Sequence, residues 1–388
     1  MRVALVHSFY TGRWPCGENE AVRDQQRALE AAGHHVTVVG AHTDELSGGP
    51  LYPVRAALRV ASGRGHHPLD DLRRVQPDIV HVHNLFPNYG HDWLDRWDGP
   101  LVVTQHNFRP LCVGGNLLKD GVPCTRCPDG DRWAGLHHGC YRGSRLASLP
   151  LALANRHGAA GHPLLRRADR VVVLSERSRL TYLRAGVPER KLALVLNSVP
   201  AVSVDGAREY RDAWLYVGRL NAQKGILGLL KRWPAGEPLD VVGDGELASA
   251  CWAAAPDSVR FLGRLDRAAV RQVMLRRRGL VFPSVSPEAS CSLTCTEAFA
   301  SSLPVLAMDG TVAADTVRAH GTGAVMTVKD PLAPTLREAT RRFPELRDQC
   351  LRTYETHFSE HVWQRRMTRL YDEVLAESGR VGAAARVS

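Results

Sequence analysis

Short runs of apolar residues recur along the chain, and each is followed by a polar turn and then by a segment with helical spacing. These runs are apolar at consecutive positions, which is typical of parallel strands buried on both faces. The predicted strands of the first half are Arg2–Val6, Val36–Val39, Ile79–Val82, Leu101–Thr104, Arg170–Leu174 and Leu192–Leu196. The predicted strands of the second half are Ala213–Val217, Leu239–Val242, Val259–Leu262, Leu280–Phe282 and Val305–Ala307. The pattern predicts an α/β protein of two Rossmann-like domains, each with a doubly wound parallel sheet.

Three further segments define the predicted domains. A first helix is expected at Asn19–Ala32, with Gly33 as its C-terminal glycine. Ser198–Arg211 has little apolar periodicity and is interpreted as a linker. A helical stripe near the C-terminus consists of Trp363, Met367, Leu370, Tyr371 and Val374. We therefore expect an N-terminal domain at 1–197, a C-terminal domain at 198–356, and a helix and tail at 357–388, the helix crossing back to the N-terminal domain.

Composition and charge exclude several classes of protein. The 388 residues are 44% hydrophobic and 23% charged, which excludes a disordered or collagen-like chain. No apolar stretch approaches the roughly 20 residues of a membrane span, and the opening MRVALVHSFY has too short an apolar run for a signal peptide, so a cytoplasmic location is expected.

The formal net charge of +10 raises the question of a polyanionic partner. The arginines are spread along the whole chain, which favours a generic basic surface over a nucleic-acid-binding face. The segment Val54–Arg64 combines arginines with apolar residues at helical spacing, so contact with an anionic membrane is a second, less favoured interpretation beside an ordinary surface helix.

The most informative motif is GRLNAQKG, which extends from Gly218 to Gly225 and directly follows the predicted strand Ala213–Val217. A strand end followed by a helix start exposes backbone N–H groups that suit phosphate oxygens. Arg219 would add a planar guanidinium, and Lys224, one of only five lysines, would add a point charge. Two solvated cations on a loop are the alternative interpretation.

Two other segments also follow predicted strands. The glycines of Gly243-Asp244-Gly245-Glu246 would let a ligand approach the backbone, or would form a plain tight turn. Residues 287–299 (PEASCSLTCTEAF) carry Glu288 and Glu297. Glu297 is expected in the first turn of a helix, placed to accept hydrogen bonds from vicinal hydroxyls. The alternative interpretation is that Glu288 lies in a surface loop and that Glu297 is an ordinary charge at the start of a helix.

Together these segments resemble glycosyltransferase family 4, whose members have the two-domain GT-B fold. VGRLNAQKG, VVGDGEL and SPEASCSLTCTEAFASSLPVL stand in the order and at the separations of that family's C-terminal half. The N-terminal half resembles the family in the Cys16-Gly17-Glu18-Asn19 turn, GHHVTVV, DIVHVHNLFP and TQHNFRP. The resemblance covers nearly the whole chain.

The resemblance implies a retaining transferase that binds a nucleotide sugar in the cleft between two domains, with no catalytic metal. By this resemblance Arg219 and Lys224 hold the donor diphosphate, Glu297 takes the ribose hydroxyls, and His106 touches the transferred sugar. The resemblance assigns catalysis to His106, Arg219, Lys224 and Glu288. The other residues that it implies on the donor side are Gly17, Gly218, Gly243, Gly245, Ser292 and Leu293.

The donor expected from the family is UDP-linked, such as UDP-glucose or UDP-N-acetylglucosamine, so that a hexose or N-acetylhexosamine is transferred. Compatible acceptors are natural-product scaffolds, including aminocyclitols, and polysaccharides or lipid-linked glycans. Two rival functions remain open. One is a GT-B sugar-nucleotide enzyme that is not a transferase, such as an epimerase. The other is a zinc-containing nucleic-acid-binding protein, which the 6% of scattered aromatic residues disfavours.

The sequence departs from the family pattern at two places. The family has seven residues between its two glutamates, whereas Glu288 and Glu297 enclose eight, so the strict register puts Ala289 at the position of the first glutamate. A one-residue bulge would restore Glu288. Cys16 stands where the first glycine of a Gly-Gly turn is usual, which predicts a less close approach of phosphate there.

Four of the nine cysteines cluster, with the spacing Cys112-x11-Cys124-x2-Cys127-x12-Cys140. The spacing suits a structural zinc site, and few apolar residues are available to give this segment its own core. Reduced or oxidised thiols and disulfides are the alternatives. A subset of family 4 carries a similar insertion, which HNFRPLC, KDGVPCTRC and CYRGS match here at 108–145, and we expect it to shape the acceptor side.

Two apparent metal motifs have plainer interpretations. Asp129 and Asp131 have the Asp-x-Asp spacing that other transferases use for a metal, but they lie in the cysteine-rich loop and are interpreted as solvated. His81 and His83 alternate along a predicted strand, so their side chains face the same side of the sheet. They could be a pair of metal ligands, but the favoured interpretation is that they are ordinary residues of the strand.

Overall fold

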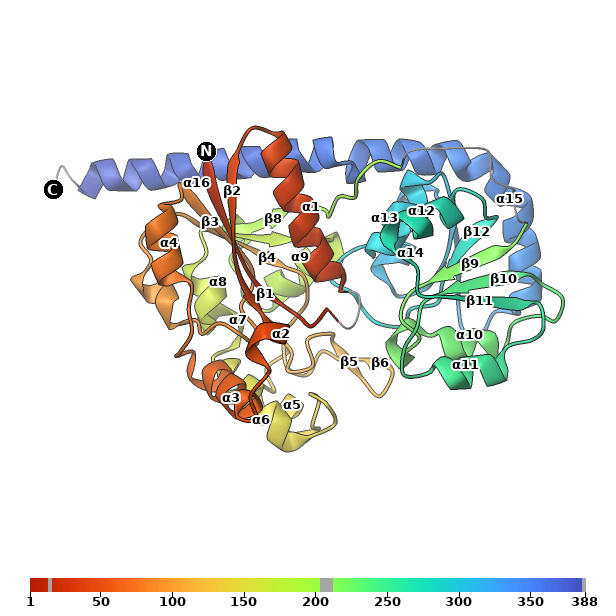
Figure 1. The fold of residues 1–388 in the computed structure, drawn as a ribbon, viewed down its shortest axis with the longest axis horizontal. Helices are drawn as coiled ribbons and strands as arrows, with labels where there is room; N and C mark the ends of the chain where they lie inside the picture. Colours follow the sequence, from red (N-terminus) through yellow and green to blue (C-terminus); the bar gives the residue numbers. More distant parts are fainter. Residues whose placement is uncertain (13–15, 203–211, 386–388) are drawn as a thin grey trace. The chain divides into compact units, whose positions relative to one another are not determined.

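The computed structural model describes residues 1–12, 16–202 and 212–385. It divides into two compact units, which are described separately (Figure 1). The N-terminal unit comprises Met1–Lys119, Cys124–Asn197 and Trp363–Ser388, and the C-terminal unit comprises Asp120–Pro123 and Ser198–Val362. Within the described residues, no helix combines the length and apolarity that crossing a membrane requires.

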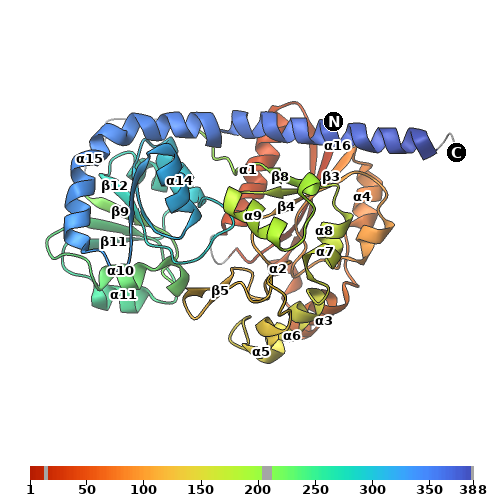
Figure 2. The same ribbon diagram turned by 180° about the vertical axis from the view of Figure 1, so that it is seen from behind.

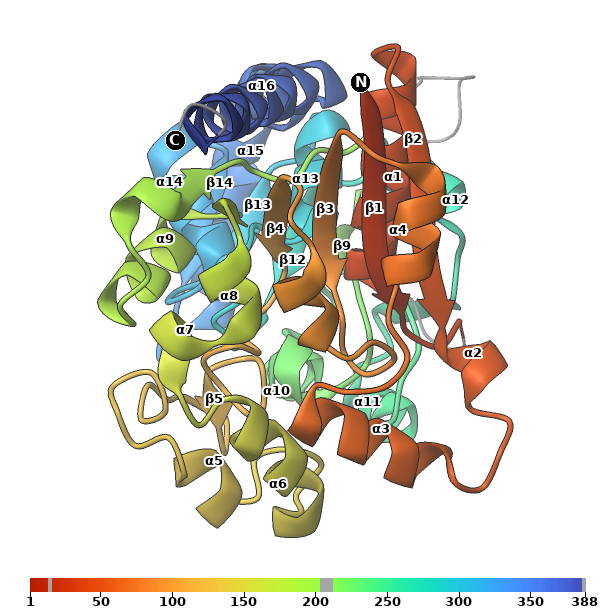
Figure 3. The same cartoon turned by 90° about the vertical axis from the view of Figure 1, so that its left-hand side faces the viewer.

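The N-terminal unit is built on a six-stranded sheet of order β2-β1-β3-β4-β7-β8, all parallel. Figure 3 shows strands β2, β1, β3 and β4 of this sheet side by side. Its strands are β1 (Arg2–Phe9), β2 (His35–His42), β3 (Ile79–Asn84), β4 (Leu101–Gln105), β7 (Arg170–Val173) and β8 (Leu192–Leu194). Its helices are α1 (Gly17–Ala31), α2 (Thr43–Leu46), α3 (Tyr52–Ser62), α4 (Leu69–Val75), α5 (Ala134–His137), α6 (Arg145–Ala154), α7 (Gly158–Gly161), α8 (Pro163–Arg167), α9 (Glu176–Arg184) and most of α16 (Glu360–Ala385), with 3-10 turns η1 (Asp92–Arg96) and η2 (Glu189–Lys191).

Helices α1 and α16 share one core with this sheet. The buried apolar stripe of α16 packs with α1 and with strands β1, β3, β4 and β7; its members are Trp363, Met367, Leu370, Tyr371 and Val374. The stripe predicted near the C-terminus therefore lies in the N-terminal core. Burial of these large side chains on the first sheet supplies much of the apolar contact that stabilises the unit.

The C-terminal unit has a second parallel six-stranded sheet, of order β11-β10-β9-β12-β13-β14. In Figures 1 and 2, helices α10 and α11 lie on one face of this sheet and α12, α13 and α14 on the other. Its strands are β9 (Trp214–Val217), β10 (Leu239–Val242), β11 (Val259–Gly263), β12 (Gly279–Phe282), β13 (Val305–Met308) and β14 (Gly323–Met326). Its helices are α10 (Ile226–Leu230), α11 (Ala248–Ala254), α12 (Arg267–Met274), α13 (Leu293–Ala300), α14 (Val312–His320) and α15 (Leu332–Thr353), with the 3-10 turn η3 (Ala222–Lys224) and the π-helical turn η4 (Tyr354–Phe358).

The cysteine-rich segment has a small core, contrary to the prediction that it lacks the apolar residues for one. Val113 packs with Leu151 and Ala152 of α6, and half-buried side chains surround them: Val60, Phe86, Leu136, Cys140 and Tyr141. Half of these residues lie outside the insertion, so inspection of the insertion alone could not supply them: Val60 of α3, Phe86 after β3, and Leu151 and Ala152 of α6. A short hairpin, β5 (Leu118–Lys119) with β6 (Val122–Pro123), completes this region.

The predicted fold class is confirmed, since every predicted strand is present in one of two parallel sheets. Strand β14 was not predicted, because the four residues Gly323–Met326 begin with glycine and form too short an apolar run at a sheet edge. Of the predicted linker Ser198–Arg211, residues 203–211 lie outside the described part of the chain. Its first residues are held by the backbone, since Val199 N–H donates to the Phe358 carbonyl at 3.1 Å.

Candidate functional site

The loop after β9 is shaped by an asparagine cap and a glycine. The Asn221 side chain accepts a hydrogen bond from the Lys224 N–H at 3.0 Å and so starts the turn η3. The turn ends at Gly225, whose φ is +69° and whose substituted Cβ would lie 2.0 Å from the Pro283 carbonyl oxygen. Only glycine fits there, and the close approach joins the loop after β9 to the end of β12.

Two hydrogen bonds to the carbonyl of Gln223 complete that junction. The Val285 N–H donates to it at 3.1 Å, and the Ser284 hydroxyl donates at 3.3 Å. The chain after β12 therefore runs beside the loop that carries Lys224. Glu288, five residues beyond Pro283, is brought back to the same place.

Lys224 and Glu288 form an ion pair, with the ammonium group against the Glu288 Oε1. Both side chains are partly buried, and the same carboxylate oxygen lies 3.3 Å from the Ser284 hydroxyl. The neighbouring Ala289 is buried. The carboxylate that pairs with Lys224 therefore belongs to Glu288. The strict register of the sequence pattern assigns Ala289 to the position of the first glutamate.

The glycines of the GDGE segment serve backbone packing. A Cβ at Gly243 would lie 1.9 Å from the Gly218 carbonyl oxygen, and one at Gly245 would lie 2.5 Å from the carbonyl oxygen of Leu220. The two loops are also hydrogen-bonded, with the Leu220 N–H donating to the Asp244 carbonyl at 3.0 Å. The second loop therefore supports the first directly.

Arg219 differs from Lys224 in its surroundings. Its side chain is exposed, and within the described residues its guanidinium has no hydrogen bond or ion pair. Its backbone carbonyl is fixed by the Tyr216 hydroxyl at 2.8 Å. The backbone is therefore held while the cation is available to a ligand.

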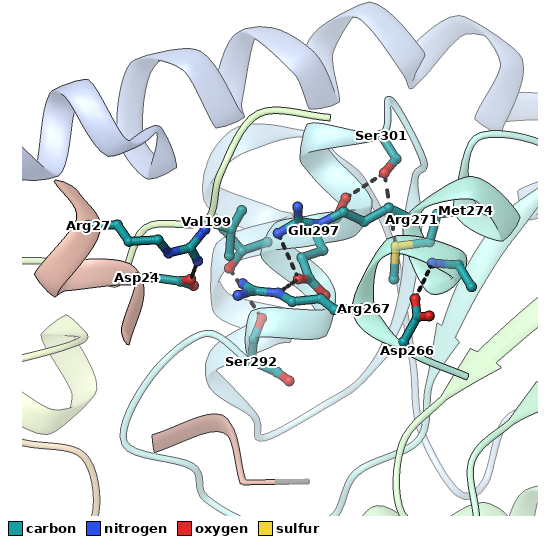
Figure 4. A network of polar contacts seen from close by, with 12 residues as sticks. Asp24, Arg27, Val199, Asp266, Arg267, Arg271, Met274, Ser292, Glu297 and Ser301 are labelled. Atoms are coloured by element: carbon teal, nitrogen blue, oxygen red, sulfur yellow. Dashed lines mark hydrogen bonds and ion pairs between the residues drawn. The ribbon is translucent and has the colours of Figure 1, made fainter. Parts of the chain in front are cut away.

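Glu297 lies in the second turn of α13, so the prediction of a first-turn position was wrong. Helix α13 begins at Leu293, with Ser292 as its N-cap, which leaves Glu297 at the fifth helical residue. Its carboxylate is buried and pairs with Arg267 and, at 3.3 Å, with Arg271, both from α12 (Figure 4). Sequence reasoning missed these two arginines, whose four-residue spacing on a helix places them on one face.

His106 lies in the N-terminal unit just after β4, beside a second histidine. Its Nε2 is 3.0 Å from Nδ1 of His83 on β3, so one ring donates to the other. Burial lowers the pKa of His106 to about 3 and that of His83 well below its ordinary value, so both rings are neutral at pH 7. His83 thereby fixes the orientation of the His106 ring.

His81 faces the same side of β3 as His83, with its ring stacked at 4.2 Å between centroids. It bonds the Tyr371 hydroxyl of α16 at 2.6 Å and the Thr104 hydroxyl of β4 at 2.7 Å. These contacts explain His81 as a structural link. Among the described residues, no three His, Cys, Asp or Glu side chains are grouped so that they could hold a metal ion.

The start of α1 carries a buried carboxylate that the sequence did not single out. Gly17 is the first residue of the helix, and Glu18 follows it, with Cys16 at the N-cap. The Glu18 Oε2 accepts a hydrogen bond from the Asn107 side chain at 3.2 Å. Burial raises the pKa of Glu18 to about 7, against the smaller opposing effects of Arg109 and Asn107.

Three of the four predicted zinc ligands influence one another. Burial raises the pKa of the Cys127 thiol to about 11; Cys112 and Cys140 add to the increase, and the backbone N–H groups of Gly135 and Val113 oppose it. Cys112 is buried, whereas Cys124 is half-buried. Asp129 and Asp131 are exposed in turns of the same loop, which agrees with their interpretation as solvated.

Two sequence-family models match the chain. Residues 17–201 match Glycosyltransferase Family 4, and residues 211–342 match Glycosyl transferases group 1. No curated protein matched the sequence significantly. These two matches together span both sheets.

Several solved structures have the same fold. Sucrose-phosphate synthase from Thermosynechococcus elongatus aligns with a TM-score of 0.66 and 19% identity, over 97% of this chain and 99% of that one. Anabaena Alr3699/HepE in complex with UDP-glucose aligns with a TM-score of 0.60 and 15% identity, over 96% and 100%. AviGT4, a glycosyltransferase involved in avilamycin A biosynthesis, aligns with a TM-score of 0.59 and 14% identity, over 97% and 98%.

The Gly225 contact generates a stability prediction. We expect Gly225→Ala to destabilise the C-terminal unit by at least about 2 kcal/mol, because alanine is strained at positive φ and its Cβ meets the Pro283 carbonyl. Thermal unfolding followed by circular dichroism measures the change. The control is Gly228→Ala in α10, where a Cβ meets nothing within 4 Å and should stabilise by about 0.5–1 kcal/mol. Equal stability of the two variants would contradict the assigned contact.

Glu18 generates a prediction about pH. A carboxyl whose pKa is raised on folding contributes stability below its unfolded pKa and loses it as pH rises to the folded value of about 7. Glu18→Gln should therefore gain stability relative to the natural chain between pH 5 and pH 8, by up to about 3 kcal/mol. Denaturant titrations at both pH values measure this gain.

The control for Glu18 is Glu20→Gln in the same turn of α1. Glu20 is partly exposed and pairs with Arg23 at 2.6 Å, so its loss should change the free energy of unfolding by about 0.5 kcal/mol or less at either pH. If Glu18→Gln behaved like Glu20→Gln, Glu18 would not be a buried carboxyl.

Proposed function

Because this chain is a glycosyltransferase, with a Family 4 domain in its N-terminal half and a group 1 domain in its C-terminal half, we propose that it is a retaining enzyme that uses a UDP-linked sugar. It transfers a hexose or N-acetylhexosamine to an acceptor hydroxyl. The donor is bound by the C-terminal unit, through the loops that follow β9, β10 and β12.

The observation that carries the proposal is the fixed position of Lys224. Its backbone is held by Asn221 and Gly225, and its ammonium group by Glu288. An ammonium group has three donors, so that two remain for oxygens of a donor diphosphate when one is bonded to Glu288. Glu288 then faces the sugar side of the same diphosphate and limits the directions in which Lys224 can turn.

Charge stabilisation is the main catalytic contribution of these residues. Displacement on the front face of the anomeric carbon needs no nucleophile from the protein, but it builds negative charge on the departing diphosphate. Arg219 and Lys224, with the N–H groups around Gly218, stabilise that charge; Lys224 is already held by Glu288, whereas the exposed Arg219 side chain becomes ordered on the diphosphate. The acceptor hydroxyl gives its proton mainly to the leaving phosphate oxygen.

Glu297 is proposed to bind the ribose hydroxyls of the nucleotide. Arg267 and Arg271 hold its carboxylate in one orientation on α13, as Figure 4 shows. Ser292 and Leu293, at the start of the same helix, face the donor sugar in this proposal. His106, oriented by His83, contacts the transferred sugar from the N-terminal unit.

Similar structures support the choice of donor and the range of acceptors. Alr3699/HepE is described in complex with UDP and with UDP-glucose, and AviGT4 acts in the biosynthesis of avilamycin A. We therefore propose UDP-glucose or UDP-N-acetylglucosamine as donor. The acceptor is a natural-product scaffold such as an aminocyclitol, or a polysaccharide or lipid-linked glycan.

We also propose that Cys112, Cys124, Cys127 and Cys140 bind a structural zinc ion, which would have to draw together four thiols that the structure does not group as metal ligands. The hydrogen bonds from backbone N–H groups to the Cys127 sulfur are of the kind that orient and stabilise metal-bound thiolates, and Cys112 and Cys140 lie nearby. Thiols that bind zinc must stay reduced, which favours a cytoplasmic location.

The donor site is tested by turnover. Lys224→Ala and Arg219→Ala should each reduce UDP release from UDP-glucose or UDP-N-acetylglucosamine by about 10²–10³-fold, because each removes a charge that stabilises the leaving group. Release of UDP with either donor, and the thermal shift that the donor produces, are measured on the same samples.

Lys231→Ala is the matched control, since Lys231 is an exposed lysine at the end of α10. It should retain full turnover. Full activity of both Lys224→Ala and Arg219→Ala would disprove the assigned site, and failure of the natural chain to bind or use any nucleotide sugar would disprove the proposed function.

The zinc proposal is tested by metal analysis of the purified chain. About one zinc per chain is expected, falling to background in Cys127→Ser, because a four-thiolate site needs all its ligands. Cys251→Ser, which changes a buried cysteine of the C-terminal unit, should retain the metal. A stable chain without zinc and with four titratable thiols in this loop would refute the proposal.

A further inference from the structure

Exposed apolar side chains gather on two neighbouring helices of the N-terminal unit. Seven of the twelve large apolar side chains that are exposed in the described residues come from two short stretches of sequence, 46–58 and 133–149. Five of the seven are on α3, with its N-cap residue, and on α6, and these two helices pack against each other. Figures 1 and 3 show α3 and α6 side by side in this unit. Single exposed leucines are ordinary, but a cluster of them marks an interaction surface.

The outward face of α3 is apolar. Val54 and Leu58 are four residues apart, and Leu51 precedes Val54 by three, so these side chains lie on one face of the helix. All three are exposed, and Leu58 retains 64% of its surface. The opposite face carries Ala56, which is buried, and Val60, which packs into the small core around α6. Helix α3 is therefore apolar on both sides.

Helix α6 has the same arrangement. Leu146 and Leu149 are three residues apart on one face and are exposed, and Leu146 retains 82% of its surface. Leu151 and Ala152 lie on the other side and are buried in the small core. The outward face of a surface helix is normally polar. Two adjacent helices with apolar outward faces therefore indicate a surface that contacts an apolar partner.

Arginines accompany these leucines, and carboxylates do not. Residues 47–69 contain three arginines and residues 132–168 contain six, and neither stretch contains an aspartate or a glutamate. The two stretches thus account for nine of the ten positive charges in the net charge of +10. Arg55 on α3, with Arg142 and Arg145 at the start of α6, are exposed, and within the described residues they form no ion pair.

Helix α4 of the same unit shows the ordinary arrangement of surface charge. Its Arg73 and Arg74 follow Asp70 and Asp71 by three residues and pair with them at 3.7 Å and 3.0 Å. Each exposed cation there has a carboxylate beside it. The arginines that lack a carboxylate partner on α3 and at the start of α6 are therefore a property of the surface that also exposes the leucines.

The combination of leucines and unpaired arginines distinguishes between partners. A second copy of this chain would bring the same cations face to face with no carboxylate between them. A nucleic acid or another soluble polyanion would neutralise the arginines but would leave the leucines in water. An anionic lipid membrane presents phosphate groups to the arginines and an acyl-chain boundary to the leucines, so it alone satisfies both.

We propose that α3 and α6 dock the N-terminal unit on an anionic lipid membrane. The five exposed apolar side chains of the two helices enter the boundary between headgroups and acyl chains, and Arg55, Arg142 and Arg145 bind lipid phosphates. The helices lie on the membrane surface, since within the described residues no helix is long and apolar enough to cross it. This surface contains none of the proposed donor-site residues, so the inference goes beyond the proposed function and does not depend on it.

Vesicle binding by the full chain tests the inference. Phosphatidylcholine vesicles with and without phosphatidylglycerol are floated with the protein, and the partition coefficient is measured at about 0.1 M and about 1 M salt. The chain should bind the vesicles that contain phosphatidylglycerol at least tenfold more tightly than the neutral vesicles, and the higher salt concentration should weaken this binding.

Two double variants separate the apolar contribution from the electrostatic one. Leu58→Ser with Leu146→Ser should weaken binding to the anionic vesicles at least tenfold, because the inserted apolar area is lost. Arg55→Gln with Arg142→Gln should also weaken it at least tenfold, because two charges that face lipid phosphates are lost. All four side chains are exposed, so the unfolding temperature measured by circular dichroism should not change.

Matched controls separate this surface from general effects of charge and apolarity. Arg73→Gln with Arg74→Gln removes two exposed cations from α4, and Leu180→Ser removes an exposed leucine from α9. Both controls belong to the N-terminal unit and should bind the anionic vesicles within twofold of the natural chain. Binding of UDP-glucose, measured on the same samples, should be the same in the natural chain and in both double variants.

Any of four results would overturn the inference. The first two are equal binding to the two kinds of vesicle and unchanged vesicle binding by either double variant. The third is a loss of binding in the controls as large as in the double variants, which would indicate an effect of total charge or apolarity. The fourth is a dimer of the natural chain in sedimentation that Leu58→Ser with Leu146→Ser dissociates, which would assign the surface to a second copy. A chain that binds UDP-glucose but no anionic vesicle refutes the membrane surface alone.

Discussion

The donor-side geometry depends on one contact between two backbone segments. The Cα of Gly225 lies against the Pro283 carbonyl, with no room for a side chain, and the adjoining Gln223 carbonyl accepts the Val285 N–H. Parallel strands end at a common edge, and this contact joins the loops after β9 and β12 there. The Lys224–Glu288 pair follows from it, because each residue is a few positions beyond the junction. The proposed catalytic cation is thus held by backbone fit and by Glu288, which takes one of its three donors and leaves two for a ligand.

In the N-terminal unit, burial acts on the protonation of histidine side chains. Its sheet edge is lined by histidines that burial keeps neutral, and His81 ties that edge to Tyr371 of the returning helix α16. A neutral ring has one donor and one acceptor, so each hydrogen bond that it makes determines what its other nitrogen can do. Tyr371 and Thr104 occupy both nitrogens of His81, which is structural. His83 gives one nitrogen to His106, and its other nitrogen has no partner among the described residues.

The fold was largely predictable from the sequence, and the candidate site was predictable only in part. Consecutive apolar runs identified the buried strands, and glycines beside Lys224 identified a loop at a strand end. The alignment of residues in the irregular loop after β12 was harder to predict. Counting residues assigned Ala289 to the position of the first glutamate, whereas the backbone hydrogen bonds of the loop bring Glu288 to Lys224. The helix start was misjudged for the same reason: Ser292 caps α13 only after the loop has turned, so that Glu297 falls in the second turn.

The partners that orient side chains were beyond prediction because they come from distant segments. Arg109 rests on Phe86 and Tyr141, and Glu18 is bonded to Asn107, so their shared surroundings arise only when α1, β3 and β4 meet. A buried carboxylate and a buried guanidinium that stop short of pairing have each lost hydration without full compensation. Such an arrangement is costly for folding, which agrees with the raised pKa of Glu18.

Glu297 shows how the chain compensates a second buried carboxylate in a different way. Glu297 is also a buried carboxylate, but Arg267 and Arg271 compensate it fully on one oxygen and fix its direction. It is therefore preorganised whether or not a nucleotide is present. Glu18 has only the Asn107 amide, and its second oxygen has no partner among the described residues, so burial raises its pKa to about 7. The two buried carboxylates thus differ because one has two cationic partners on the adjacent helix, whereas the other is bonded only to a neutral amide.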